Sequence, residues 1–133
     1  YQFCTTYCTM KFEVHKASAD EYFKIAEEED SKLAVEKDEV KKIAFRVVAA
    51  QNYFYSIVNL IEAAFAKKLA YHSFSHENRM NKLIESRTIF SNEIIKLYEL
   101  VDRDQRNKVT YRGENGEKYK NIKQLAKMLM ELQ

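Results

Sequence analysis

The most regular feature of the sequence is an apolar pattern between residues 43 and 70. Apolar side chains recur there at alternating steps of four and three, which keeps one side of an α-helix facing a partner. A second apolar stripe beside the first predicts that more than one neighbour contacts this helix. The two stripes are Ile43, Val47, Ala50, Phe54, Ile57, Ile61 and Ala64, and Ala44, Val48, Tyr55, Val58, Phe65 and Leu69. At ~1.5 Å per residue the helix would be about 42 Å long, enough to be the scaffold of a small bundle.

Shorter helical patterns lie on both sides of this scaffold. One begins at Phe12 and ends near Glu36, where Asp38 is suited to cap the scaffold helix. A short helix is expected after Ser73 or Ser75, either of which can cap it. The apolar sets of the later helices are Met80, Leu83 and Ile84; Phe90, Ile94, Leu97, Tyr98 and Val101; and Tyr119, Ile122, Leu125, Ala126, Leu129 and Leu132. No segment has the alternating pattern of a strand flanked by turns, so the sequence predicts an all-α fold.

Length and composition are typical of one globular domain. The chain has 133 residues, of which 46% are hydrophobic and 32% charged, so it can bury a core and is not a disordered chain. Residues 1–11 contain both cysteines, Cys4 and Cys8, but neither the charged start nor the apolar run of a signal peptide. We expect residues 1–11 to be a disordered or non-native leader and residues 12–133 to form a single domain. No apolar run reaches the ~18 residues that a membrane span requires, which predicts a cytoplasmic protein without a membrane partner.

Glycine and charge single out residues 102–119. This stretch contains both glycines, Gly113 and Gly116, of a chain that has no proline, and it interrupts the helical pattern. The formal net charge of +2 is too small to mark a general nucleic-acid binder. Bases nevertheless outnumber acids between residues 102 and 123. Local positive charge and interleaved hydrogen-bonding side chains therefore make residues 102–119 the predicted site.

Arg106 and Asn107 are the most informative pair in that stretch. A guanidinium group can bind phosphate through two hydrogen bonds, an adjacent amide can read a base, and Tyr111 can stack or donate a hydrogen bond. We therefore assign ligand binding to Arg106, Asn107, Lys108, Tyr111 and Arg112. The alternative is that Arg106 only caps the C-terminal end of the preceding helix, where the helix dipole favours a cation.

Polar residues on the other helices give two further candidates. Asn52, Ser56 and Asn59 form a polar line on the scaffold helix, and they either line a cleft or mark the solvent edge of that helix. His72 and His76 have the spacing of two metal ligands on one helix face, but no third ligand is spaced to complete a site. We predict no metal and no cofactor. His76 is expected to cap the short helix or to form a hydrogen bond at its start, and His72 is expected to lie at the surface.

Several segments together resemble the HEPN domain family. They are Asn-Tyr-Phe-Tyr-Ser (52–56), Ala-Ala-Phe-Ala (63–66), His-Ser-Phe-Ser-His (72–76), Leu-Tyr-Glu-Leu (97–100) and Arg-Asn-Lys-Val-Thr-Tyr (106–111). The resemblance covers nearly the whole chain from about residue 12 onward. It implies an up-and-down four-helix bundle with an additional short helix, usually a homodimer, that binds a nucleotide, RNA or a nucleotidyltransferase partner.

The resemblance also bears on catalysis, because many HEPN proteins are metal-independent ribonucleases, including toxins paired with a nucleotidyltransferase antitoxin. Their motif is an Arg, usually followed by a polar residue, and then a His after four to six intervening residues. Arg106 and Asn107 match, whereas the positions allowed for the His hold Tyr111, Arg112 and Gly113. A tyrosine with a pKa near ~10 is a poor substitute for an imidazole in proton transfer. We therefore expect binding without strong catalysis; the alternatives are an endoribonuclease toxin using Arg106 with Tyr111, and a structural interaction module.

Overall fold

The computed structural model describes the backbone of residues 2–106 and 117–132, and the side chains of residues 12–105 and 117–132. The described residues form helices and no strand, so the all-α prediction is confirmed. The helices are α1 (Gln2–Val35), α2 (Glu39–Leu69), α3 (His76–Glu85), α4 (Asn92–Arg106) and α5 (Glu117–Glu131). Within this part of the chain, no helix is both long enough and apolar enough to cross a membrane.

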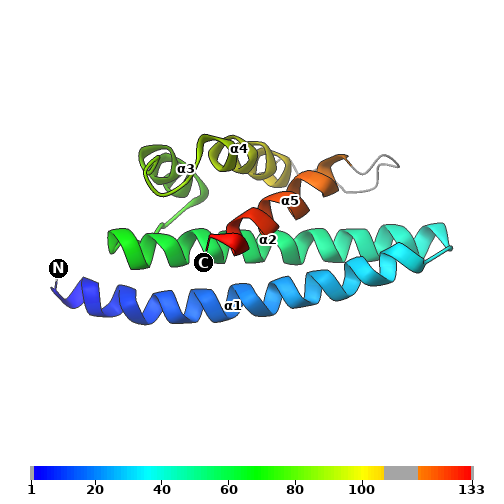
Figure 1. Ribbon diagram of the computed structural model, residues 1–133, viewed down its shortest axis with the longest axis horizontal. Helices are drawn as coiled ribbons and strands as arrows, with labels where there is room; N and C mark the ends of the chain where they lie inside the picture. The colour runs from blue at the N-terminus through cyan, green and yellow to red at the C-terminus, as the bar shows by residue number, and fades with distance from the viewer. Residues whose placement is uncertain (1, 107–116, 133) are drawn as a thin grey trace.

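Helices α1 and α2 form a long antiparallel pair that carries the rest of the fold (Figure 1). The connection between them is short, and the carboxylate of Asp38 caps α2 by accepting a hydrogen bond from the backbone N–H of Lys41 at 3.0 Å. Both the end of the first helix near Glu36 and the cap at Asp38 are thereby confirmed. Helix α1 begins at Gln2, before Phe12, where the helical pattern becomes recognisable in the sequence. The assignment of residues 1–11 as a leader stays a prediction.

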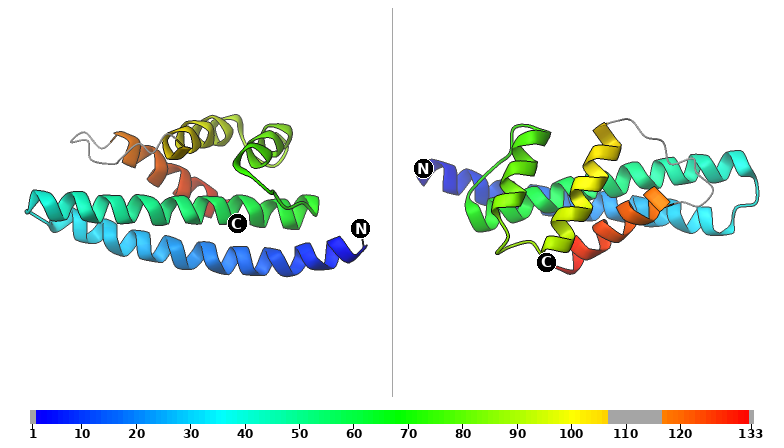
Figure 2. Two further views of the ribbon diagram at one scale, coloured as in Figure 1. Left: turned by 180° about the vertical axis from the view of Figure 1, so that it is seen from behind. Right: turned by 90° about the horizontal axis from the view of Figure 1, so that it is seen from above.

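Helices α3 and α4 lie on the side of α2 that faces away from α1, and α5 descends from their side to lie beside α2 (Figure 1). Helix α5 packs against both α2 and α4, and α3 packs against α4. Seen from above, α3 and α4 run across the long axis of the α1–α2 pair, and α5 runs obliquely to it (Figure 2, right). Helix α2 is therefore the scaffold, with α1 on one side and α5 on another, and the prediction that more than one neighbour contacts it is confirmed.

The buried face of α2 differs in part from the predicted one. The ring of Tyr53, which belongs to neither stripe, is fully buried between Phe23 of α1 and Tyr119 of α5, at centroid distances of 5.7 and 6.2 Å. The predicted stripes are wrong at five exposed positions: Val47 in the first stripe, and Ala44, Val48, Tyr55 and Leu69 in the second. Apolar spacing shows that a helix has an apolar side, but contacts with α1 and α5 decide which side is covered.

The shorter helices bury most of their predicted faces. Ser75 caps α3 by accepting a hydrogen bond from the backbone N–H of Asn78 at 3.0 Å, as one of the two predicted serines. The buried residues include Leu83; Phe90, Ile94, Tyr98 and Val101; and Tyr119, Ile122, Leu125, Ala126 and Leu129. Two members of the predicted sets, Ile84 and Leu132, are exposed instead.

Candidate functional site

The predicted site lies at the junction of α4 and α5. Arg106 is the last residue of α4, and its side chain lies outside the described part of the chain. Asn107, Lys108, Tyr111 and Arg112 also lie outside it, so their predicted ligand contacts stay predictions. The C-terminal end of α4 and the N-terminal end of α5 lie at the same end of this packed pair (Figure 1). The described groups near this junction therefore define the surroundings of the predicted site.

His76, the first residue of α3, lies beside the C-terminal half of α4. Its Nδ1 is 3.2 Å from Oδ1 of Asp102, whose side chain is 2% exposed, whereas the His76 side chain is 54% exposed. Asp102 precedes Arg106 by one helical turn, so the two residues lie on the same side of α4. His76 is thus hydrogen-bonded at the start of the short helix, as expected. Its partner is a side chain of another helix, which local sequence does not reveal.

His76 also lines two cavities in the described part of the chain. One of about 310 Å³ is bounded by Met80, Asn81 and Asp102, and the other, of about 170 Å³, by Gln51 and Gln105 among others. An imidazole that contacts a buried carboxylate through one ring nitrogen can present the other nitrogen to a ligand. Of this pair, Asp102 lies in α4 one helical turn before Arg106, and His76 belongs to α3.

A buried polar cluster joins α2 to α3 and α4. Glu62 is 2% exposed, and its carboxylate accepts hydrogen bonds from Nε of Arg79 at 2.8 Å and from the backbone N–H of Ser73 at 3.0 Å. Nη1 of Arg79 also donates to the hydroxyl of Tyr98 at 3.5 Å. These bonds hold the connection between α2 and α3 against the core. The cluster thereby fixes the start of α3, where His76 lies.

Two histidines extend this cluster towards α1. Nδ1 of His72 is 3.5 Å from Oε1 of Glu62, and the His72 ring stacks on the ring of His15 at a centroid distance of 5.6 Å. Nδ1 of His15 is in turn 2.8 Å from Oδ1 of Asn59. The side chain of His72 is 34% exposed, so the expectation that it lies simply at the surface is only partly correct. Its contact with the buried carboxylate of Glu62 keeps the His72 ring partly buried.

The polar line Asn52, Ser56 and Asn59 follows the scaffold helix. The hydroxyl of Ser56 is fully buried and donates to the backbone oxygen of Ala19 in α1 at 2.9 Å, so the solvent-edge interpretation does not hold for it. The amide nitrogens of Asn52 and Asn59 donate to backbone oxygens one turn earlier in α2, at 2.9 and 2.8 Å. Helix pairing and local hydrogen bonds thus account for these groups, and a role in lining a cleft stays a prediction.

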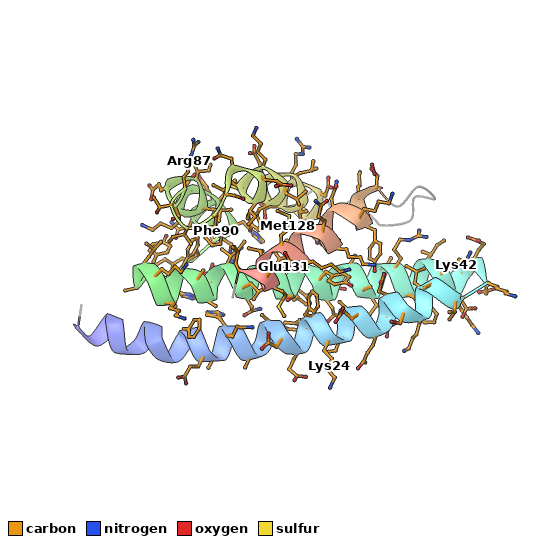
Figure 3. The ribbon with its side chains drawn as sticks, in the orientation of Figure 1. Lys24, Lys42, Arg87, Phe90, Met128 and Glu131 are labelled. Carbon is orange, nitrogen blue, oxygen red and sulfur yellow. The ribbon has the colours of Figure 1, made fainter. Side chains whose placement is uncertain are left out.

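Helix α5 presents a cationic surface that continues from the predicted site. An open depression of about 510 Å³ is lined by Lys120, Lys123, Gln124, Lys127, Met128 and Glu131. Lys120 and Lys127 are exposed, whereas Nζ of Lys123 donates to Asp30 of α1 at 2.6 Å. Their spacing places the three lysines along one side of the helix. Figure 3 labels Met128 and Glu131, which mark the depression towards the C-terminal end of α5.

Sequence reasoning missed the buried pair of Glu62 and Arg79. A signal for Glu62 was present, because Ser56, Asn59 and Glu62 follow one another at steps of three and the polar line therefore continues to Glu62. No comparable signal existed for Arg79, whose partner is 17 residues away in the sequence.

Among the described residues, no group of three or more His, Cys, Asp and Glu side chains is arranged to hold a metal ion. No family model, no curated protein and no solved structure matches the chain.

Proposed function

We propose that the chain is a cytoplasmic HEPN-type protein, a four-helix bundle with an additional short helix, that binds RNA or a nucleotide. The ligand contacts are residues 106–112 and the cationic side of α5. The observation that carries this proposal is a row of lysines along an open depression that follows the predicted site. Lys120 and Lys127 are exposed there, whereas Lys123 between them is paired with Asp30. Regularly spaced phosphates of a nucleic-acid strand are the anions that such a row of cations attracts.

Fluorescence anisotropy with labelled single-stranded RNA tests this binding. The double variant Lys120→Ala/Lys127→Ala is expected to bind about tenfold more weakly and to have a smaller salt dependence, because about two phosphate contacts are removed. The matched control is Lys24→Ala/Lys41→Ala, which removes two exposed lysines from α1 and α2. Equal affinities of the two double variants would contradict the proposal. Arg106→Ala tests the contribution of the residue at the end of α4 in the same assay.

A second function, a metal-independent endoribonuclease, is favoured by the contact of His76 with Asp102. The exposed imidazole lies beside two cavities and contacts Asp102, which precedes Arg106 by one helical turn. In the sequence, the HEPN-like motif has Tyr111 instead of a histidine. In this function His76 accepts the proton of the ribose 2′-hydroxyl as the 2′-oxygen attacks phosphorus. The bond from phosphorus to the 5′-oxygen breaks, and solvent protonates the leaving oxygen. Such an enzyme would act as the toxin of a pair with a nucleotidyltransferase.

Incubation of the protein with labelled RNA and with tRNA in a metal chelator separates the two functions. Cleavage that is lost in both Arg106→Ala and His76→Gln, but retained in Lys24→Ala, supports the endoribonuclease. Cleavage that persists in His76→Gln excludes the proposed role of that imidazole. Binding without cleavage supports the binding protein, and the absence of both supports a structural interaction module.

We further propose that the protein forms a homodimer or pairs with a nucleotidyltransferase through α2. Val40, Ala44, Val48 and Tyr55 are exposed on this helix, and Val40 is 76% exposed. Their steps of four and seven place them along one side, as in helices that pair with a partner. Light scattering at micromolar concentration checks the homodimer. A monomeric mass would exclude it, and a dimer that Val48→Glu dissociates would support this surface.

A further inference from the structure

An apolar cavity lies away from the residues assigned to RNA binding. It has a volume of about 330 Å³ and lies where α1, α2, the segment before α4 and the C-terminal end of α5 meet. Its lining includes Leu60, Phe90 and Leu129, each about 1% exposed, and the partly buried Ala64. Phe90, labelled in Figure 3, contacts the ring of Phe65 in α2 edge-on at a centroid distance of 6.0 Å. The interior of the cavity is therefore part of the hydrophobic core.

The rim of this cavity is cationic. Lys67 and Lys68 of α2 line it and are exposed, and Nζ of Lys67 lies 5.0 Å from the ring centroid of Phe12 in α1. Lys16 also lines the cavity, but its ammonium group is paired with Asp20 at 2.7 Å. Within the described part of the chain, neither Lys67 nor Lys68 is paired with a carboxylate. The cavity thus combines an apolar interior with positive charge that the described residues leave uncompensated.

We infer that this cavity binds a medium-chain carboxylate, with its apolar tail against Leu60, Phe90 and Leu129 and its carboxylate at Lys67 and Lys68. The apolar lining excludes a small hydrophilic anion as the preferred ligand, and the two cations favour a negative head group. The volume is near the lower end of the ~300–1,000 Å³ range of small-molecule sites, which suits one unbranched tail. This site is separate from the proposed RNA site and goes beyond it.

Octanoate is the probe, used below its micelle concentration with the full chain. Calorimetry is expected to show saturable binding of one octanoate per chain, and amide resonances of Leu60, Ala64, Phe90 and Leu129 are expected to shift. Acetate, which lacks the tail, is expected to bind more than about a hundredfold more weakly. Octyltrimethylammonium, which has the tail but a positive head group, is expected to leave these resonances unchanged. Equal binding of octanoate and this cation would overturn the assignment of the head group.

The variant Lys67→Gln/Lys68→Gln tests the rim without altering the core. Octanoate is expected to bind it about tenfold more weakly, while Lys24→Gln/Lys41→Gln retains the affinity of the natural chain. In Figure 3, Lys24 points away from the other helices, so it is a matched exposed control. Ala64→Phe, which fills the cavity, is expected to abolish binding with unchanged helical circular dichroism. Unshifted resonances of the lining residues, or full affinity in the rim variant, would overturn the inference.

Discussion

Arg79 in α3 donates from Nε to Oε2 of Glu62 in α2 at 2.8 Å, and the two side chains are only 12% and 3% exposed. Removing one member of a buried ion pair leaves the other charge without its partner in a poorly solvated place. We therefore expect Arg79→Ala to lower the free energy of unfolding by about 3 kcal/mol, measured by urea denaturation.

Lys42→Ala is the control for this pair, because Lys42 forms an exposed ion pair with Glu39 at 3.4 Å and is labelled in Figure 3. Its loss is expected to cost less than about 1 kcal/mol. The double variant Glu62→Leu/Arg79→Met, which removes both charges, is expected to be more stable than Arg79→Ala. If Arg79→Ala cost no more than Lys42→Ala, the pair would not stabilise the fold.

Asp30 of α1 links the long pair of helices to α5. Its carboxylate accepts hydrogen bonds from the Tyr119 hydroxyl and from Nζ of Lys123, both at 2.6 Å. Burial alone would raise the pKa of Asp30, but these hydrogen bonds and the charges of Lys123 and Lys127 outweigh burial, so its pKa lies below the usual value. The fold therefore favours the charged form of Asp30.

A carboxyl group whose pKa is lower in the folded chain than in the unfolded chain stabilises the fold when the pH is above the unfolded pKa. This stabilisation is lost as the pH falls through the folded pKa. We expect Asp30→Asn to lower the free energy of unfolding by about 1 kcal/mol at pH 7, after allowance for its partial exposure. The difference is expected to shrink as the pH falls below about 4. Urea denaturation at several pH values measures the difference between Asp30→Asn and the natural chain. The control is Glu28→Gln, at an exposed position of the same helix. A difference that does not depend on pH would contradict the argument.

Tyr98 makes stability sensitive to alkaline pH. Burial raises the pKa of Tyr98 to about 12. The charge and hydrogen bond of Arg79 lower this pKa, and the carboxylates of Asp102 and Glu62 raise it by a smaller amount. The unfolded chain releases this proton near pH ~10, so the free energy of unfolding is expected to fall as the pH rises from about 10 to about 12.

Tyr98→Phe is expected to reduce this fall by up to about 1.4 kcal/mol per pH unit, the contribution of one proton. A smaller fall remains, because burial also raises the pKa of Tyr53 and of Tyr119. Tyr55→Phe, at a position that is 40% exposed, is expected to behave like the natural chain. Chemical denaturation between about pH 9 and 12 checks these expectations, and identical slopes for the two variants would refute the role of Tyr98.

The cap at the N-terminal end of α2 gives a further prediction about stability. Asp38 satisfies the backbone N–H of Lys41, which would otherwise lack a partner within the helix. We expect Asp38→Ala to lower the free energy of unfolding by about 1 kcal/mol and Lys37→Ala to have almost no effect. Thermal unfolding followed by circular dichroism compares them, and equal midpoints would argue against the cap.

Features that depend on a few neighbouring residues could be predicted from the sequence. The caps at Asp38 and Ser75 follow from local hydrogen bonding, and the buried sides of α4 and α5 follow from apolar spacing. The all-α fold follows from the same periodicity and the absence of strand patterns.

Features that depend on how helices pack could not be predicted in this way. Tyr53 is buried because Phe23 and Tyr119 meet it from two other helices, and His76 meets Asp102 across 26 residues of sequence. A single sequence carries no record of such pairs. Charge and glycine content predict the candidate site, whereas the contact of His76 with Asp102 depends on how α3 packs against α4.

The hydrogen bond from Ser56 to the backbone oxygen of Ala19 fixes how far α1 can slide along α2. Ala19 has no side chain beyond Cβ, so the two backbones approach closely there, and a shift by one turn would bring a larger residue to the buried Ser56 hydroxyl. The contacts of His15 with Asn59 and of Asp30 with Tyr119 lie on opposite sides of this point along α1. Both contacts depend on how α1 is aligned with its neighbours, so a larger residue at position 19 would be expected to disturb contacts on both sides of this point.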